Sequence, residues 1–211
     1  IQRIVYKNKK NKQGQEELIK VRELAFPDFY DYDYYYFQAI ESAQDQGKHL
    51  CVAKARRKGY SYKGGSMLCR NFFLIPGSKS YVYASNKQYL TDDGILTKAW
   101  DYMDFIDENT AWGKKRQAVN TSMRRRASMI VTDNFGNKIE VGYKSEIIGV
   151  SLKDNPDAVR GKAGMLILWE EAGTFPELKA AWQIARPSVE QDGVAFGLMI
   201  MFGTGGDEGP A

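Results

Sequence analysis

Histidine and cysteine are nearly absent from this 211-residue chain. His49 is the only histidine, which argues against a histidine-based catalytic triad and against a histidine-rich metal site. The two cysteines, Cys51 and Cys69, lie in apolar surroundings without the spacing of metal ligands. They indicate reduced thiols in a cytosol-like compartment rather than a disulfide framework.

Long apolar runs are missing as well. No run approaches the roughly 20 residues that a membrane-spanning helix needs, and no signal-like segment opens the chain, so no membrane partner is expected. A hydrophobic share of 43% and a charged share of 27% are typical of a globular domain with a real core. Because the chain opens at Ile1 rather than Met and stops after a glycine-rich turn, we expect it to be a piece of a longer protein.

A strong surplus of one charge is also lacking, since the formal net charge is only +4. Charge is nevertheless segregated: residues 112–126 hold six basic and no acidic side chains, and residues 91–108 hold six acidic side chains and one lysine. The two blocks either pair with each other or expose a basic face to nucleic-acid phosphates. Arg124, Arg125 and Arg126 are the candidate DNA-backbone contacts. The alternative is a solvated shoulder of a hairpin or a salt-bridge face between subunits.

Short apolar strands alternate with helical segments along most of the chain, which predicts an α/β domain with a largely parallel sheet. Strands are expected at 49–53, 80–85, 146–152, 165–169 and 195–202, and helices at 35–46, 64–73, 87–106 with a break near 94, and 176–185. Segments 127–132 and 138–143 flank an Asn- and Gly-containing turn and predict an inserted β-hairpin. Residues 1–19 predict an exposed hairpin or arm, within an N-terminal arm or subdomain of residues 1–34 that precedes the main domain, 35–211.

A basic, glycine-containing turn, Lys54–Lys63, joins the first of these strands to the helix after it. Strand, turn and helix in this order are typical of a phosphate-binding loop, where backbone N–H groups and a helix N-terminus face an anion. The pattern G-x-x-x-x-G-K-[ST] is not met, because Tyr60 occupies the lysine position between Gly59 and Ser61. An Arg- and Lys-rich surface turn is the alternative interpretation.

Two adjacent carboxylates, Glu170 and Glu171, end the buried strand at 165–169. Side chains alternate between faces along a strand, but both can reach one crevice where the strand turns at the carboxyl edge of the sheet. A metal-dependent nucleotide hydrolase needs such a pair, one acid to hold Mg²⁺ and one to orient or deprotonate water. The alternative is a surface pair of glutamates that starts a loop.

A third signal, Gly203-Thr204-Gly205, follows another buried strand. With these three signals in this order, the sequence resembles the large terminase subunits of tailed bacteriophages, specifically their N-terminal ATPase motor domain. The resemblance covers residues 37–207 approximately and rests on segments 54–63, 159–162, 165–175, 182–187 and 202–206. It implies a three-layer P-loop NTPase fold of the additional-strand (ASCE) type, with a mainly parallel central sheet.

The resemblance also implies roles for individual residues. Ser61 would bind Mg²⁺ through its hydroxyl, and Glu170 would be the Walker B acid that helps hold the metal. Glu171 would be the catalytic carboxylate that positions water, and Arg56 matches an arginine near the γ-phosphate. The nucleotide-binding set would be Lys54, Arg57, Lys58, Gly59, Tyr60, Ser61 and Lys63, and the coupling motif Gly203, Thr204 and Gly205.

Tyr60 departs from the family pattern, because it replaces the Walker lysine. Some terminases carry the lysine nearer the start of the loop, so Lys54 is the natural substitute, with Lys58 and Lys63 also within reach. The deviation leaves open a degenerate P-loop module that binds DNA or a partner protein without hydrolysing ATP. The intact pair of glutamates disfavours that alternative.

The resemblance implies ATP and Mg²⁺ as cofactors and double-stranded DNA as the transported substrate. Its implied partners are a portal protein or procapsid, a small terminase subunit and further copies of the chain in a ring, in the host cell cytoplasm. The family's C-terminal nuclease domain is absent from this sequence, so no nuclease activity is expected. A helicase-like or other DNA translocase is the alternative within enzymes.

Overall fold

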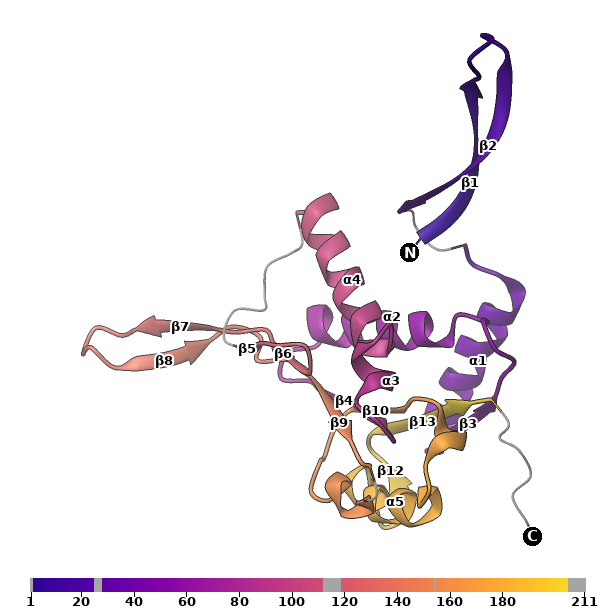
Figure 1. The fold of residues 1–211 in the computed structure, drawn as a ribbon. Helices are drawn as coiled ribbons and strands as arrows, with labels where there is room; N and C mark the ends of the chain where they lie inside the picture. Colours follow the sequence, from indigo (N-terminus) through magenta and orange to yellow (C-terminus); the bar gives the residue numbers. More distant parts are fainter. Residues whose placement is uncertain (1, 25–27, 112–118, 154, 205–211) are drawn as a thin grey trace. The chain divides into compact units, whose positions relative to one another are not determined.

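A computed structural model of the chain describes residues 2–24, 28–111, 119–153 and 155–204 (Figure 1). The chain forms two compact units, residues 1–38 and residues 39–211. The division falls within helix α1 (Asp31–Asp45), a few residues beyond the predicted boundary after residue 34. Functional roles for the two units remain predictions.

The first unit contains a long antiparallel hairpin of β1 (Gln2–Lys10) and β2 (Glu16–Leu24), as the sequence predicts for this region. The Asn11 side chain closes the turn by accepting hydrogen bonds from the backbone N–H groups of Gln13 and Gln15, both at 3.0 Å. Helix α1 starts four residues before the predicted position. Asp33 accepts a 2.9 Å hydrogen bond from the Tyr30 backbone N–H, which satisfies an otherwise unpaired donor at the helix start.

The second unit is built on a seven-stranded sheet with the order β3-β13-β10-β4-β9-β6-β5. The strands are β3 (Leu50–Ala53), β13 (Leu198–Gly203), β10 (Leu166–Trp169), β4 (Lys79–Ala84), β9 (Glu146–Ser151), β6 (Arg124–Arg126) and β5 (Val119–Asn120). Neighbouring strands from β3 to β9 run parallel, and β6 and β5 are antiparallel to their neighbours. Strand β13 lies between β3 and β10, which is the additional strand of the predicted ASCE class.

Helices cover both faces of this sheet (Figure 1). They are α2 (Tyr60–Leu74), α3 (Gln88–Thr91) and α4 (Ile95–Asn109) on one side and α5 (Leu178–Ala185) on the other. Ile167 and Trp169 of β10 pack in the cluster that contains α5, whereas Leu168 faces Gly64 of α2. A side chain at Gly64 would lie 2.5 Å from Ile95, so glycine allows α2 and α4 to approach closely. Burial on both faces explains why β10 is a continuous apolar run.

Shorter elements connect these layers. They are the single-turn helices η1 (Pro156–Val159), η2 (Ala172–Thr174) and η3 (Arg186–Ser188), and the short ribbon of β11 (Glu190–Gln191) with β12 (Val194–Ala195). The predicted inserted hairpin is β7 (Met129–Thr132) paired with β8 (Lys138–Val141), and it extends away from the sheet (Figure 1).

Several predicted bounds needed correction. Helix α2 begins at Tyr60 rather than at residue 64, directly after the basic turn, and α5 begins at Leu178 rather than at Pro176. The break near Gly94 is confirmed, because α3 and α4 are separate helices on either side of it. Strands β5 and β6 were not predicted, since two or three residues are too short for a recognisable period. Within the described residues no helix has the length and apolarity to cross a membrane.

Candidate nucleotide site

The loop between β3 and α2 leaves a helix N-terminus open to an anion. Gly59 precedes α2 in a left-handed conformation, with φ of 71°, and no side chain caps the helix. Arg57 also has a positive φ, of 61°, so the loop reverses direction within a few residues. Arg56, Arg57 and Lys58 are exposed, and the first turn of α2 has no acidic residue. A long helix with a free N-terminus and surrounding cations provides the physical basis for phosphate binding.

Glu170 lies at the carboxyl end of β10 and points toward this loop. Ser61 donates a 2.7 Å hydrogen bond from its hydroxyl to Oε1 of Glu170, which joins the two predicted metal ligands. The Glu170 backbone N–H donates to the Tyr83 carbonyl, continuing the β10–β4 ladder one residue past the strand. The side chain is only 4% exposed, and Oε2 has no hydrogen-bond partner within the described part of the chain.

The environment of Glu170 disfavours its charged form. Burial raises the pKa of its carboxyl to about 7, the negative charge of Glu171 adds to the rise, and the hydrogen bond from Ser61 opposes it. A buried carboxylate oxygen without a partner is costly, and native structures rarely keep one without a reason. Oxygen atoms in this arrangement, a hydroxyl and a carboxylate, suit a hard divalent cation such as Mg²⁺.

Glu171 turns into the same crevice because its backbone leaves the strand conformation. Its φ and ψ of 48° and 56° lie in the left-handed region, which is uncommon for a residue with a side chain. Oε1 accepts a 2.7 Å ion-paired hydrogen bond from Nζ of Lys54, and Oε2 faces the backbone N–H of Thr204 at 3.4 Å. The structure therefore brings both carboxylates to one crevice, as the sequence predicts for this pair.

Strand β13 delivers the third sequence signal to this carboxylate. The Thr204 hydroxyl lies 3.5 Å from Oε2 of Glu171, and Lys54 extends the β3–β13 pairing by donating its N–H to the Gly203 carbonyl. A side chain at Gly203 would come within 2.9 Å of the Ala172 backbone nitrogen. Glycine therefore allows β13 to pass close to the turn that carries Glu171. Gly205 lies outside the described residues.

These groups line a pocket of about 370 Å³ at the carboxyl edge of the sheet. Its walls are Lys54, Arg56, Arg57, Ser61, Glu170, Glu171, Thr174 and Thr204, and facing them Tyr89, Asp92, Asp93 and Gly94. The sequence did not predict Thr174 or any member of the second group as part of the site. The Asp-Asp-Gly sequence at 92–94 was a usable signal, because it follows β4 by one short helix and parallel strands present their carboxyl ends at one edge.

No family model and no curated protein matches this sequence. Solved structures do match its fold. The ATPase domain of the large terminase of Thermus phage P74-26 aligns with a TM-score of 0.57 and 16% identity, over 84% of this chain and 70% of that one. An arginine-to-alanine mutant of that domain gives 0.58 and 16%, over 85% and 71%. The HK97 bacteriophage large terminase gives 0.57 and 11%, over 85% of this chain and 34% of that one.

The chain has the fold of a phage large terminase ATPase domain. The likeness extends over most of the sequence, so the resemblance in fold is confirmed. At identities of 11–16% it concerns the fold alone. What the pocket can bind or catalyse therefore depends on its own side chains.

Within this terminase fold, Tyr60 and Lys63 point away from the pocket walls. The Tyr60 ring packs against Phe202 of β13, with ring centroids 6.1 Å apart. Nζ of Lys63 lies 4.1 Å from the Tyr60 ring and donates a 3.3 Å hydrogen bond to the Lys58 carbonyl. Lys63 is buried, and its hydrogen bond to Lys58 stabilises the loop. Among the lysines predicted to replace the Walker lysine, Lys54 is the one that lines the pocket.

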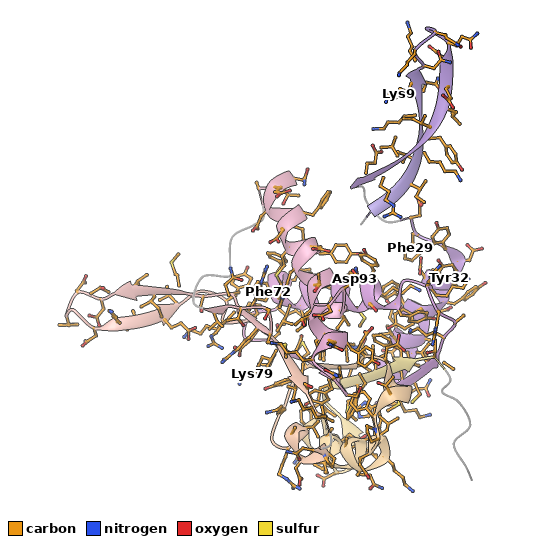
Figure 2. All side chains as sticks on the ribbon, viewed as in Figure 1. Lys9, Phe29, Tyr32, Phe72, Lys79 and Asp93 are labelled. Carbon is orange, nitrogen blue, oxygen red and sulfur yellow. The ribbon has the colours of Figure 1, made fainter. Side chains whose placement is uncertain are left out.

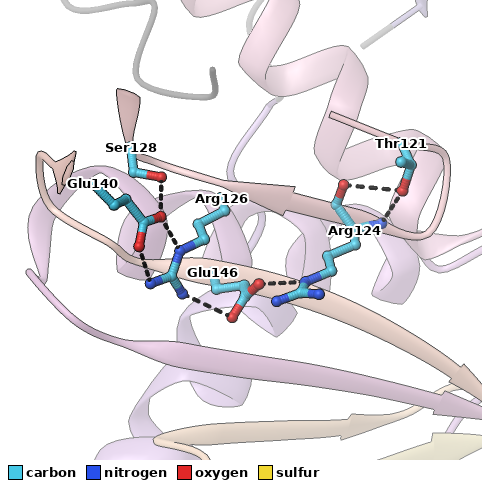
Figure 3. Close-up of polar contacts among 6 residues, drawn as sticks. All are labelled: Thr121, Arg124, Arg126, Ser128, Glu140 and Glu146. Atoms are coloured by element: carbon cyan, nitrogen blue, oxygen red, sulfur yellow. Dashed lines mark hydrogen bonds and ion pairs between the residues drawn. The ribbon is translucent and has the colours of Figure 1, made fainter. Parts of the chain in front are cut away.

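The predicted DNA-contacting arginines, Arg124 to Arg126, lie on β6 and are held in ion pairs (Figure 3). Arg124 pairs through Nε with Oε1 of Glu146, which is only 2% exposed. Arg126 pairs with Oε2 of the same Glu146 at 3.2 Å and with both oxygens of Glu140 at 2.5 and 3.0 Å. The two arginines therefore compensate a buried carboxylate and tie the inserted hairpin to the sheet.

The remaining contacts complete this cluster. Ser128 donates a 2.5 Å hydrogen bond to Glu140. The hydrogen bond from Arg126, and after it the one from Ser128, lowers the pKa of Glu140 to about 2. Arg125 stacks its guanidinium 4.4 Å from the Trp100 ring and lies 3.5 Å from Asp104. The pair of Arg125 and Asp104 joins the basic block to the acidic block. It agrees with the first interpretation of the charge pattern, in which the two blocks pair with each other. DNA contact by these arginines remains a prediction.

Proposed function

We propose that this chain is the ATP-hydrolysing motor domain of a viral DNA-packaging terminase, which couples Mg-ATP hydrolysis to translocation of double-stranded DNA into a procapsid. The observation that carries the proposal is the buried Glu170, hydrogen-bonded to Ser61 at the open end of α2 and with Oε2 unpartnered among the described residues. A buried carboxylate beside a phosphate-binding helix end has a clear chemical use in holding a metal-bound phosphate.

In this proposal Lys54 replaces the missing Walker lysine as the cation that binds phosphate. Its side chain is only 7% exposed and its ammonium is within 2.7 Å of Glu171, so it already lies in the pocket. Phosphate oxygens would compete for this ammonium, since they carry more negative charge than one carboxylate. Loss of the ion pair to Lys54 would leave Glu171 available to accept a proton from water.

Ser61 and Glu170 would hold Mg²⁺, and the ion would supply positive charge that offsets the charge of the phosphate oxygens. The residues fit this ion because both offer hard oxygen atoms and because burial has raised the pKa of Glu170 to about 7, a shift that a cation would oppose. Arg56, exposed on the loop and lining the pocket, would stabilise charge on the terminal phosphate.

Thr204 and Gly203 would carry the coupling step. Thr204 contacts the same carboxylate oxygen that Lys54 leaves free, so a change at Glu171 reaches β13 directly. Gly205, which completes the predicted motif, is part of this proposal from sequence only. The proposed partners are double-stranded DNA, a portal protein or procapsid, a small terminase subunit and further copies of the chain, in the host cytoplasm.

The test is Mg²⁺-dependent phosphate release, with nucleotide binding followed separately by a fluorescent ATP analogue. Glu171→Gln should lower release by about 10²- to 10⁴-fold, the usual value of a positioned general base, and change nucleotide affinity by less than about threefold. Glu177→Gln is the matched control, because Glu177 is exposed and outside the pocket lining. Normal hydrolysis by Glu171→Gln would sink the proposal.

One observation favours a second function, a P-loop module that binds nucleotide or a partner without hydrolysis. Tyr60 occupies the lysine position and packs on Phe202 instead of facing the pocket. The same assay separates the two functions: the second requires that the unmodified chain bind Mg-ATP yet release no phosphate, both alone and within any longer protein that contains it. A helicase-like enzyme would instead separate the strands of a duplex.

A further inference from the structure

The β1–β2 hairpin carries the whole positive surplus of the chain. It holds seven lysines and arginines against three glutamates, a surplus equal to the formal net charge of +4. The rest of the sequence is therefore electrically balanced. The described basic side chains of the hairpin, including Lys9, which Figure 2 labels, are exposed to solvent. A concentrated positive charge of this kind attracts polyanions and steers their approach.

The two faces of the hairpin differ, and the strand register assigns each residue to one of them. We call the first face the Tyr6 face, because Tyr6 lies opposite Lys20 on it; its described residues are Ile4, Tyr6, Asn8, Lys10, Glu16, Leu18, Lys20 and Arg22. The second face, the Lys7 face, holds Val5, Lys7, Lys9, Glu17, Ile19, Val21 and Glu23. By this register the Tyr6 face has three cations against one acid, and the Lys7 face, to which Arg3 also belongs, has three cations against two acids.

The faces also differ in what is already paired and covered. Lys7 on the Lys7 face forms a 2.5 Å ion pair with Glu23, whereas Nζ of Lys20 on the Tyr6 face lies 5.7 Å from the centre of the Tyr6 ring. Ile4, Tyr6 and Leu18 are 58%, 59% and 63% exposed. Exposed apolar side chains next to cations suit a partner of matching chemistry. Such a partner has anionic groups along its backbone and apolar surface between them.

A two-stranded hairpin is at best marginally stable by itself, so a partner that covers one face would stabilise it. In the described residues β1 and β2 pair only with each other. The major groove of B-DNA is wide enough to admit a two-stranded ribbon, and phosphates line both of its edges. The dimensions and the charge therefore agree on one class of partner.

We propose that the Tyr6 face of the β1–β2 hairpin binds the phosphate backbone of double-stranded DNA without sequence preference. Lys10, Lys20 and Arg22 contact phosphates, and Tyr6 and Leu18 lie against the sugar edge of the groove. The choice of DNA rests on the proposed function, but the charged face is a feature of the hairpin alone. This site is separate from the β6 arginines, which pair within the chain.

The test compares two double variants with the same change in charge. Lys20→Gln with Arg22→Gln alters the Tyr6 face, and Lys7→Gln with Lys9→Gln alters the Lys7 face. Binding of a labelled duplex of about 30 base pairs and mixed sequence is followed by fluorescence anisotropy between about 50 and 200 mM salt, without nucleotide. Because all four residues are exposed, both variants should keep the melting temperature of the parent chain.

Loss of two phosphate contacts should lower the slope of log affinity against log salt by about 2, and weaken binding about tenfold or more at the lowest salt. The Lys7-face variant should change the slope by less than about 0.5. Equal losses in the two variants, or no loss in either, would overturn the proposal. So would a Tyr6-face variant that binds DNA normally but no longer self-associates in sedimentation, since the face would then receive an acidic protein surface.

Nucleotide hydrolysis measured on the same variants separates this inference from the proposed function. Failure of the hairpin test with hydrolysis intact would remove only the DNA-binding face. Loss of hydrolysis in Glu171→Gln, together with the reduced salt slope of the Tyr6-face variant alone, would confirm both. Absence of hydrolysis in the unmodified chain, with the Tyr6-face effect present, would remove the motor and keep the DNA-binding hairpin.

Discussion

The pocket at the carboxyl end of β10 and the arginine cluster on β6 both hold glutamates against basic side chains on the same sheet. In the β6 cluster both oxygens of Glu140 and both oxygens of Glu146 have basic partners (Figure 3). In the pocket, Glu170 has one hydrogen bond and a second oxygen without a partner among the described residues. The glutamate oxygens thus all have partners in the β6 cluster, whereas one glutamate oxygen in the pocket has none among the described residues.

The backbone conformation is also regular in the β6 cluster and unusual in the pocket. Arg124 and Arg126 lie on a regular strand, whereas Glu171 holds a left-handed conformation at the end of one. Strain and unsatisfied polar groups cost stability, and they persist where the surrounding fold imposes them. A saturated network contributes to folding, and an incomplete one can accept a ligand. This comparison predicts which substitutions alter activity and which alter stability.

Beyond Glu171→Gln, the largest effect is expected at Lys54. Lys54→Met should lower Mg-ATP turnover about 10³-fold, equivalent to about 4 kcal/mol in the activation barrier, because the pocket loses its buried cation. The melting temperature should change little, since the partner Glu171 can turn to solvent. Steady-state phosphate release measures the effect. Lys58→Met is the matched control on the exposed loop, and an equal loss there would mean that the wrong lysine had been assigned.

The arginine cluster should respond in the opposite way. Replacing both Arg124 and Arg126 by Met leaves the 2%-exposed Glu146 without its cations, which should cost about 3 kcal/mol in the free energy of unfolding. Urea denaturation measures this, and turnover per folded molecule should remain unchanged. Lys138→Met, a similar loss of charge on the exposed face of β8, is the control. A loss of turnover without loss of stability would show that the two sites had been confused.

Stability should depend on pH through Glu170. Its folded pKa of about 7 lies above the ordinary value of 4.5, so its stabilising contribution is complete below pH 4.5 and is lost as pH rises through 7. Glu170→Gln should remove this loss. In the metal-free state, the free energy of unfolding of the variant relative to that of the parent should therefore be higher at pH 8 than at pH 5, by up to about 3 kcal/mol. Urea denaturation of both proteins in EDTA at the two pH values gives the difference. An unchanged pH profile in the variant would contradict the assigned environment.

A smaller effect is expected at Gly203. Because an added methyl group would press on the Ala172 backbone, Gly203→Ala should displace the turn that carries Glu171 and lower turnover about tenfold, or about 1.4 kcal/mol. Nucleotide affinity should stay within a factor of about three. Gly193→Ala, in the turn between β11 and β12, tests whether any loss of a glycine has this result. Equal turnover in the Gly203 variant would show that the close approach is not needed.

The fold class and most of the elements were predictable from the sequence. Continuous apolar runs such as β10 predicted strands buried on both faces, and the interval between them predicted helical crossovers in a parallel sheet. Helix starts were less predictable, because that of α1 depends on a hydrogen bond between Asp33 and the Tyr30 backbone. Strands β5 and β6 escaped prediction, since their pairing depends on β9 rather than on any period of their own.

The site residues divide in a similar way. The sequence by itself determined that Ser61, Glu170, Glu171 and Thr204 follow strands, and strand ends of a parallel sheet meet at one edge, so their meeting follows from local pattern and general topology. Tertiary structure alone decided that Lys54 reaches the pocket while Lys63 braces the loop, because both lie in one basic run and only packing distinguishes them.

Packing also decided the fate of the arginines. A run of basic residues has the same sequence pattern whether it binds phosphate or neutralises a buried carboxylate such as Glu146, which lies 20 residues beyond Arg126. The number of charges is a property of the sequence, and their pairing is a property of three-dimensional distance. The sequence therefore determined the fold and the chemical groups available, and the tertiary structure decided which of them remain available to a ligand, because Coulomb and hydrogen-bond energies depend on separation and burial.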